Sequence, residues 1–414
     1  MWDLIVIGGG AAGLWGAGTA AARGQRVLVL EKNRKPGVKI LMSGGTRCNI
    51  THNCDIDGIL RAFGKQGRFL KPALHALPPM AVVAEINRLG VATKVEDSGK
   101  VFPVSDRAID VRDALVQRLE QAGATLHSGV AVTDVRQDEQ LQWLVQTDTE
   151  QLLARQVLLC CGGLSYAGCG TTGDGYAWAR RAGHTLVETF PALTPLLSPA
   201  AWVHELTGIT LPDVEARVVT ADKKLKDPRL TSRGGFLWTH FGCSGPVPMN
   251  VSRFVASAPE PHKVNLQLDL VPDMNEAELI DRFDATRSGR RSVAAVLQPL
   301  VPRNMAACLL KRAHVLEAAP LAELSRPSRL QLLEDLKRML VPLSGTRGYP
   351  KAEVTAGGVS TREVNPQTLE SRLAKGLFLA GEILDIDGPI GGFNFQAAFS
   401  TGHLAGLHVA IGEP

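Results

Sequence analysis

The sequence predicts an α/β protein in which a parallel sheet with helices is interrupted by a β-barrel-like insertion and a small helical subdomain. Three observations lead to this prediction. A strand–helix–strand pattern fills residues 3–31, alternating strands with Pro and Gly turns occupy 196–272, and helical spacing of apolar residues runs through 275–340. At 414 residues, with 45% apolar and 21% charged side chains, the chain is long enough for two or three globular domains.

The first forty residues contain a complete strand–helix–strand unit. Residues 3–7 form a β-branched run typical of a buried parallel strand, and residues 14–23 are Ala-rich and predict a helix. The turn between them reads GGGAAG, and a second strand over 26–30 ends at Glu31. This arrangement is typical of a Rossmann-like dinucleotide-binding domain.

Each part of this unit has a chemical role in holding a dinucleotide. Gly8 permits the tight turn, Gly10 lets the backbone approach a pyrophosphate, and Gly13 allows helix and strand to pack closely. The helix start, with Ala12 in its first turn, offers N–H groups and a positive dipole end to the phosphates. Glu31 can accept hydrogen bonds from ribose hydroxyls.

The segment after the second strand favours FAD over NAD. Residues 32–49 form a cationic, Gly-rich loop without a dehydrogenase-like continuation, and such a loop suits a long cofactor. Because the chain has a single GxGxxG, we expect NADH or NADPH to bind only transiently, if it reduces the flavin. The candidate cofactor contacts in this loop are Lys32, Lys39, Ser43, Gly44, Arg47 and Asn49.

Residues 110–165 continue the cofactor domain. An amphipathic helix is predicted over 111–122 and a strand over 125–132, with the backbone of Val130 near the adenine. Residues 141–147 and 152–154 predict a hairpin, and the apolar strand 157–161 ends at Gly162 and Gly163, beside the cofactor.

The chain is predicted to leave this domain after residue 192 and to return near 363. The predicted domains are 1–192 and 363–414 for the FAD-binding domain, 193–274 with 345–362 for the barrel-like insertion, and 275–344 for the helical subdomain. The substrate is expected where the insertion meets the cofactor domain.

The C-terminal part supplies the flavin end of the predicted site. A strand over 377–380 ends in Gly381 and Glu382, and this acid is expected to bond a ribitol hydroxyl. Gly392, Phe393 and Asn394 then open an Ala-rich helix whose N–H groups and dipole would stabilise negative charge on reduced flavin.

Five segments are similar to those of one flavoprotein family. They are residues 39–51 (KILMSGGTRCNIT), 162–175 (GGLSYAGCGTTGDG), 239–246 (THFGCSGP), 349–359 (YPKAEVTAGGV) and 376–402. The chain resembles the NAD(P)/FAD-dependent oxidoreductases that include aminoacetone oxidases, a bile-acid enone reductase and a ribosomal RNA dihydrouridine synthase. Thr46 replaces a usual Gly, and Cys160-Cys161 replaces a common Ala-Thr, so the resemblance implies a divergent subfamily.

Two residues are candidates for proton transfer. Cys48 could act as an acid thiol near the flavin, or be a small buried side chain. His240, beside Cys243 and Ser244, could orient substrate or donate a proton, or be structural. No Cys/His spacing suits zinc, so no metal site is predicted.

The resemblance implies an oxidoreductase acting on a small molecule, either an amine or an activated alkene. One alternative is reduction of a uridine in ribosomal RNA, to which the basic cluster at Arg287, Arg290 and Arg291 gives weak support. Another is a flavin-binding sensor or scaffold without turnover. Seven cysteines without a CxxC motif predict a cytoplasmic protein, and no membrane span is predicted. The sequence leaves the oligomeric state open.

Overall fold

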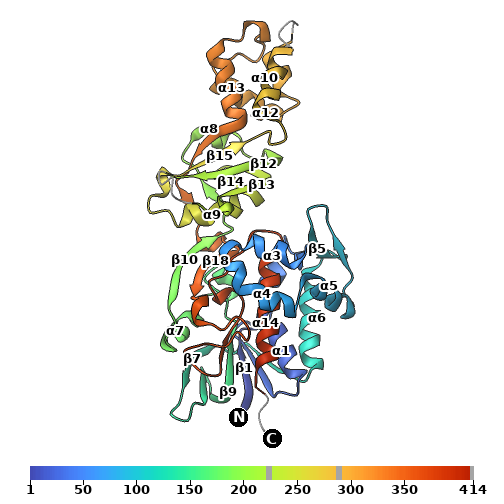
Figure 1. Ribbon diagram of the computed structural model, residues 1–414, viewed down its shortest axis with the longest axis vertical. Coiled ribbons are helices and arrows are strands. Elements are labelled where there is room, and N and C mark those ends of the chain that lie inside the picture. The colour runs from blue at the N-terminus through green and yellow to red at the C-terminus, as the bar shows by residue number, and fades with distance from the viewer. Residues whose placement is uncertain (221–225, 286–290, 411–414) are drawn as a thin grey trace. The chain divides into compact units, whose positions relative to one another are not determined.

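The computed structural model describes residues 1–220, 226–285 and 291–410, and it divides into two compact units (Figure 1). Unit 1 comprises Met1–Phe190 and Glu353–Pro414, and unit 2 comprises Pro191–Ala352. Each unit has its own hydrophobic core. The four-domain division stays a prediction, but residues 353–362, which we expected in the insertion, belong to unit 1.

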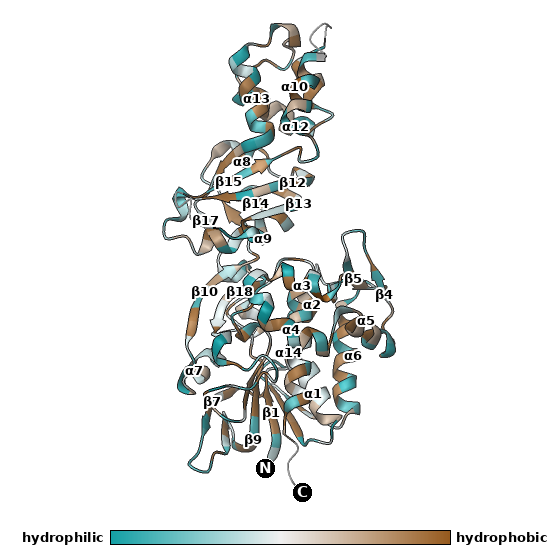
Figure 2. Cartoon of the chain, viewed as in Figure 1, coloured by the Kyte–Doolittle hydropathy of each residue, from teal (hydrophilic) through white to brown (hydrophobic). Residues whose placement is uncertain are grey.

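Unit 1 is built on a mostly parallel sheet. Its strands are, in spatial order, β6 (Thr125–Ser128), β2 (Val27–Glu31), β1 (Trp2–Ile7), β9 (Gln151–Leu159), β8 (Trp143–Thr147) and β7 (Val132–Gln137), and β19 (Leu377–Leu379) pairs with the end of β9. Strands β6, β2, β1, β9 and β19 are parallel, whereas β8 and β7 extend the sheet antiparallel. The central strands are apolar (Figure 2) and buried, as expected of a parallel sheet covered by helices. The Rossmann-like prediction is therefore confirmed.

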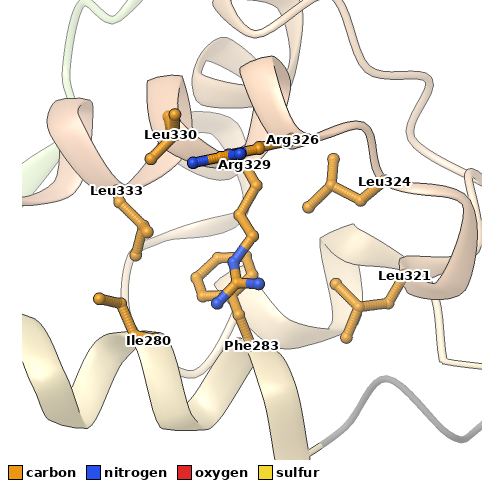
Figure 3. Close-up of a pocket in the computed structure, with 8 residues that line it drawn as sticks. All are labelled: Ile280, Phe283, Leu321, Leu324, Arg326, Arg329, Leu330 and Leu333. Atoms are coloured by element: carbon orange, nitrogen blue, oxygen red, sulfur yellow. The ribbon is translucent and has the colours of Figure 1, made fainter.

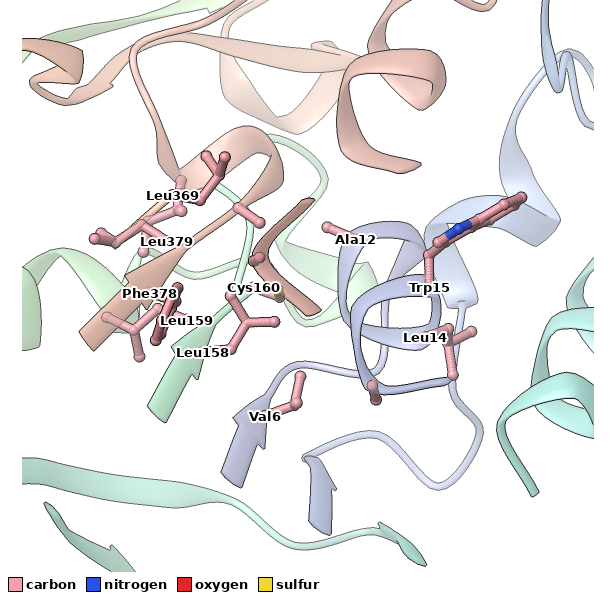
Figure 4. Packing of buried hydrophobic residues seen from close by; sticks show 14 of the residues in the cluster. Val6, Ala12, Leu14, Trp15, Leu158, Leu159, Cys160, Leu369, Phe378 and Leu379 are labelled. Carbon is pink, nitrogen blue, oxygen red and sulfur yellow. The ribbon is translucent and has the colours of Figure 1, made fainter. Parts of the chain in front are cut away.

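Two helices pack tightly on each other in unit 1. They are α1 (Ala11–Ala21) and α14 (Phe393–His408). A Cβ on Gly402 would overlap Ala12 O, and a Cβ on Gly16 would lie 2.8 Å from Gly402 O. Leu14 and Trp15 of α1 belong to the core shown in Figure 4, with residues of β1, β9 and β19. Small residues thus bring the two backbones into direct contact.

The rest of unit 1 covers this framework. A small antiparallel sheet contains β3 (Thr51–His52), β5 (Lys100–Pro103) and β4 (Thr93–Val95), and β10 (Leu186–Ala192) pairs with β18 (Val354–Val359). The remaining helices are α2 (Val38–Met42), α3 (Ile56–Ala62), α4 (Gly67–Ala76), α5 (Pro79–Arg88), α6 (Ala108–Gln121) and α7 (Asp174–Arg181). The sequence pattern predicts none of the elements between residues 50 and 110.

Unit 2 contains a seven-stranded antiparallel sheet. Its spatial order is β16 (Met339–Pro342), β15 (Asn265–Asp269), β12 (Thr210–Val219), β13 (Thr231–Thr239), β14 (Gly242–Ser244), β11 (Leu196–Leu197) and β17 (Gly345–Thr346). Only two residues separate β16 from β17, although these strands lie at opposite edges of the sheet. The two edges must therefore approach each other, and the sheet is curled into a barrel-like form. Helices α8 (Ala201–Glu205) and α9 (Pro246–Ala256) pack against it.

The other helices of unit 2 lie where helical spacing predicts them. They are α10 (Glu276–Ala285), α11 (Val293–Leu297), α12 (Arg303–Arg312) and α13 (Arg326–Arg338). Arg312 forms a bidentate ion pair with buried Asp335, which ties α12 to α13. Of the basic cluster at 287–291, residues 287–290 lie outside the described residues. Within the described ranges, no helix is both long and apolar enough to span a bilayer.

Candidate coenzyme site

Close backbone contacts shape the glycine turn after β1. Gly8 has a φ of 104°, and a Cβ there would lie 2.5 Å from Cys160 O. A Cβ on Gly13 would overlap Gly8 O, so α1 reaches the strand only because residue 13 is glycine. The surroundings of Gly10 are open, because a Cβ added there would meet no other group within 4 Å. This open space is where a pyrophosphate is predicted.

Both α1 and α14 begin with N–H groups that remain available. Gly10 and Gly392 precede the two helices, and no side chain caps either start. The first N–H bond of α1 runs from Leu14 to Gly10 O, and that of α14 runs from Gln396 to Gly392 O. The three N–H groups that precede each of these donors can therefore bind a ligand.

The starts of α1 and α14 are offset from each other along the direction of the helix axes. The contact between Ala12 and Gly402 lies at the start of α1 but nine residues after Phe393, the first residue of α14. Contacts of Gly16 and Ala20 with Gly406 show that the helices run parallel. At 1.5 Å per residue, α14 begins about 12 Å before the α1 start. This spacing suits one elongated molecule with an anionic group at each helix start.

Glu31 is buried, and its carboxylate is mostly paired. Its Oε2 accepts from Gly9 N–H at 2.8 Å, and its Oε1 accepts from the backbone N–H and the side-chain amide of Asn33 at 2.8 and 2.7 Å. A carboxylate has about four acceptor positions, so one remains for a ribose hydroxyl. Val130 donates its backbone N–H to Glu31 O at 3.0 Å, which leaves only its carbonyl for an adenine.

Glu382 lies at the centre of a second polar network. Its Oε2 pairs with Lys39 Nζ at 2.6 Å, and its Oε1 accepts from Ser165 Oγ at 2.6 Å and Thr355 N–H at 2.9 Å. Lys39 also donates to Ser165 Oγ at 2.7 Å. Here too one acceptor position of the carboxylate remains, in keeping with the predicted ribitol contact.

The segment 49–52 holds the start of α14. With its amide oriented so that both atoms are paired, Asn49 accepts from Gly392 N–H at 2.9 Å. Thr51 Oγ1 donates to Gln396 Oε1 at 2.6 Å, and the His52 ring stacks on Phe393 with centroids 4.6 Å apart. The side chain of the predicted cofactor contact Asn394 is bonded to Gly388, at 2.8 and 2.9 Å. The backbone of this helix start, rather than these side chains, is thus left for a ligand.

Other predicted contacts are engaged within the protein. Arg47 lies 3.9 Å above the Phe102 ring and pairs with Glu96 at 2.7 Å. Lys32 pairs with Asp174 at 2.6 Å, and Ser43 Oγ donates to Ile40 O at 2.8 Å. The predicted glycines are backbone positions: Gly44, Gly162 and Gly381 have positive φ, and a Cβ on Gly163 would overlap Thr355 Oγ1. Whether these residues contact a cofactor stays a prediction.

The two predicted proton-transfer residues lie in different environments. Cys48 is 0% exposed and has a φ of 63°. Burial raises the pKa of its thiol to about 12, so it keeps its proton at neutral pH. His240 is exposed and belongs to unit 2. Both catalytic assignments stay predictions. Among the described residues, no group of three or more His, Cys, Asp or Glu side chains is placed to hold a metal.

Ser165 and Thr355 are functional candidates that the sequence pattern does not single out. Both lie in segments that carry the family resemblance, residues 162–175 and 349–359, which is the signal that could have found them. Thr355 Oγ1 accepts from Leu164 N–H at 2.8 Å and Ser165 N–H at 3.1 Å. Thr355 therefore holds the backbone of residues 164 and 165 in place, and Ser165 in turn donates to Glu382.

A separate cavity lies among the helices of unit 2 (Figure 3). It has a volume of about 290 Å³ and combines apolar walls with two arginines. Its lining residues are Ile280, Phe283, Leu321, Leu324, Arg326, Arg329, Leu330 and Leu333. Arg329 is paired with Asp284 at 2.8 Å.

The residues of unit 1 fit FAD. FAD carries a pyrophosphate, ribose and ribitol hydroxyls, and a flavin ring that becomes negative on reduction. The two uncapped helix starts, the open space at Gly10 and the acceptor positions left on Glu31 and Glu382 match these groups in kind.

Two relatives of known activity match nearly the whole chain. A 3-dehydro-bile acid delta(4,6)-reductase of Clostridium scindens is 31% identical over 411 residues, covering 98% of each chain. A ribosomal RNA dihydrouridine synthase of Escherichia coli is 30% identical over 404 residues, covering 97% of this chain and 96% of that protein.

A solved structure shows the same fold. The 3-ketosteroid delta1-dehydrogenase of Sterolibacterium denitrificans, in complex with 1,4-androstadiene-3,17-dione, aligns over 99% of both chains with a TM-score of 0.53 and 14% identity. Residues 2–408 match the family described as HI0933-like protein Rossmann domain. Together with the two relatives above, this match shows that the chain belongs to the HI0933-like family.

Proposed function

We propose that this FAD-dependent oxidoreductase reduces a carbon–carbon double bond conjugated to a carbonyl group in a small molecule. The observation that carries the flavin part of the proposal is the pair of parallel helix starts with open space at Gly10, and the substrate class rests on the two relatives. When bound, FAD would supply hydride transfer at its central ring. All seven cysteines are free thiols, which supports a cytoplasmic location.

The protein's part is to bind and orient. The N–H groups of residues 11–13 would hold the pyrophosphate, and Glu31 would accept from the ribose. Glu382, held by Lys39 and Ser165, would accept from the ribitol. The α14 start would stabilise negative charge at the pyrimidine end of the flavin.

The relatives favour an activated alkene over an amine. A 3-oxo group conjugated to the delta(4,6) double bonds and the ring of uridine share one feature, a double bond conjugated to a carbonyl. Such a bond accepts hydride at one carbon and a proton at the other. NADH or NADPH, bound transiently, would supply the electrons.

Uridine in ribosomal RNA is the second candidate substrate. Two relatives are named ribosomal RNA dihydrouridine synthase, one at 30% and one at 29% identity, and both align over nearly the whole chain. Mass spectrometry of ribosomal RNA from a deletion strain decides between the candidates. If the dihydrouridine content is unchanged and the purified enzyme turns over a 3-oxo-4-ene steroid, the small molecule is the substrate class that remains.

Replacing Gly10 tests the cofactor site directly. In Gly10→Ala the added methyl group meets no protein atom, so the free energy of unfolding of the flavin-free protein should change by less than about 0.5 kcal/mol. FAD affinity should fall about 10-fold or more, because the methyl group occupies the space of the pyrophosphate. Gly168→Ala is the matched control, since its Cβ also meets nothing within 4 Å.

Anaerobic titration with NADH and with NADPH, followed by addition of an enone, completes the test. The proposal requires reduction of the bound flavin and its reoxidation by the enone. Purified protein that releases no flavin on denaturation, or a Gly10→Ala variant with unchanged FAD affinity, contradicts it.

A further inference from the structure

A short hairpin in unit 2 carries two planar side chains. Thr239 of β13 pairs with Gly242 of β14, so the connection between them consists of His240 and Phe241 alone. Two-residue hairpin connections with positive φ favour Gly, Asn and Asp. Neither His240 nor Phe241 has a positive φ, so the backbone of this turn accepts side chains of any size.

The hairpin tip is held firmly from one side. Phe241 O accepts from Ser198 N–H at 3.0 Å, and β14 pairs with β11. A Cβ on Gly242 would lie 2.8 Å from Ser198 N, so the strands are in close contact. The two side chains at the tip are therefore presented on a fixed backbone.

A guanidinium completes this group. The Arg347 side chain, which follows β17, lies 4.5 Å above the Phe241 ring, and the His240 ring meets Phe241 edge-on at 5.0 Å. Arg347 and His240 are exposed, and Phe241 is half-buried. No carboxylate in the described part of the chain forms an ion pair with Arg347.

We propose that His240, Phe241 and Arg347 form a stacking platform that binds a nucleotide, with its base against the planar groups and its phosphate near the Arg347 guanidinium. Bases stack on exposed aromatic rings and guanidinium planes, and cations beside the rings hold the phosphate. The platform lies in unit 2 and goes beyond the proposed function, since it requires only that a nucleotide binds there. The nucleotide is either free or part of RNA.

Binding is measured on the full chain carrying its flavin. Fluorescence anisotropy with a labelled single-stranded oligouridylate reports binding, and unlabelled uridine monophosphate is the competitor. Phe241→Ala and Arg347→Ala should each weaken binding about 10-fold. Arg347→Lys keeps the positive charge but lacks the planar guanidinium group. Its affinity should therefore fall nearly as far as that of Arg347→Ala.

Arg303→Ala is the charge-matched control in the same unit. Arg303 is 79% exposed in its side chain and pairs loosely with Glu317 at 3.8 Å, so its loss should leave the affinity within about 2-fold. Flavin content and thermal midpoint confirm that each variant is folded.

Displacement of the probe by uridine monophosphate identifies a free nucleotide as the ligand, and binding of the oligonucleotide alone identifies RNA. The platform is refuted if neither probe binds, if the Phe241 and Arg347 variants bind like the parent, or if Arg347→Lys restores full affinity. Equal weakening by Arg303→Ala would also refute it, since the binding would then be non-specific. A chain without flavin would contradict the proposed function but would leave this binding assay valid.

Discussion

Thr46 is a β-branched residue held in a left-handed backbone conformation, with a φ of 71°. Such a conformation costs an L-residue roughly 1–2 kcal/mol, and for a β-branched residue the cost lies at the upper end of this range. Thr46→Gly should raise the free energy of unfolding by about 0.5 kcal/mol, because relief of this strain outweighs the greater entropy of the unfolded Gly chain. Urea denaturation measures the change.

Thr46→Ala separates strain from the loss of the side chain. It removes the same hydroxyl, which donates to Gly45 O at 2.6 Å, but keeps a Cβ. A stability of Thr46→Gly equal to or below that of Thr46→Ala would show that the backbone conformation is not the source of the effect.

Loss of the Glu382 carboxylate should lower both the stability of the protein and its affinity for FAD. Glu382→Ala leaves Lys39, Ser165 and Thr355 N–H without their acceptor, so unfolding should become easier by about 2 kcal/mol and FAD affinity should fall about 10-fold. Glu382→Gln keeps the amide oxygen for Ser165 and Thr355 and should lose less than half of that stability. Denaturant unfolding and FAD titration of the two variants check this order; equal losses would mean that the hydrogen bonds at Oε1 contribute little.

At the scale of elements, the contact between α1 and α14 makes the protein sensitive to acid. His403 of α14 lies 3.0 Å from Thr19 Oγ1 of α1, with Arg118 and Glu85 as the charged groups nearby. Burial and then the charge of Arg118 lower the pKa of His403 to about 4, although Glu85 opposes this shift. Between pH 6.5 and 4 the unfolded chain binds a proton at this site and the folded chain does not. Stability should therefore fall by about 2 kcal/mol as the pH drops through this window.

His403→Gln removes this proton-linked loss. The variant's free energy of unfolding should depend less on pH between 6.5 and 4, as followed by urea denaturation at each pH. His262→Gln is the control, because His262 is exposed in a short 3-10 helix of unit 2 (Pro261–Lys263). An unchanged pH dependence in His403→Gln would contradict the assignment.

The elements that the sequence predicts are those with a local signature. The GGGAAG turn, the apolar runs of β1, β2 and β9 and the helical spacing of α10 and α13 each depend on neighbouring residues, and the structure has them in place. Residues 353–362, by contrast, belong to unit 1 and not to the insertion that the sequence predicts for them, because the pairing of β18 with β10 is a long-range contact that no local pattern reports. The network of Lys39, Ser165 and Glu382 joins three distant segments, so its geometry could be found only from the fold.

At the scale of the whole molecule, unit 1 and unit 2 have separate hydrophobic cores. The buried apolar clusters of unit 1 and unit 2 share no residue, and every predicted FAD contact lies in unit 1. The chain leaves unit 1 through β10 and returns through β18, and these two strands pair with each other. The ends of the insertion are therefore neighbours in space, and unit 1 does not depend on unit 2 to bring its two segments together.

We therefore expect a chain lacking residues 191–352, with Phe190 joined to Glu353 by a Gly/Ser linker of about six residues, to fold and bind FAD. Its FAD affinity should stay within about 10-fold of the full chain, because the helix starts and both carboxylates are retained, whereas turnover of substrates should be lost with unit 2. Flavin absorbance, thermal unfolding and anaerobic reduction measure these properties. The same deletion carrying Gly10→Ala is the control and should bind FAD about 10-fold more weakly or worse. A folded deletion variant without bound flavin would show that unit 2 supplies part of the coenzyme site, and the assignment of FAD to unit 1 alone would be wrong.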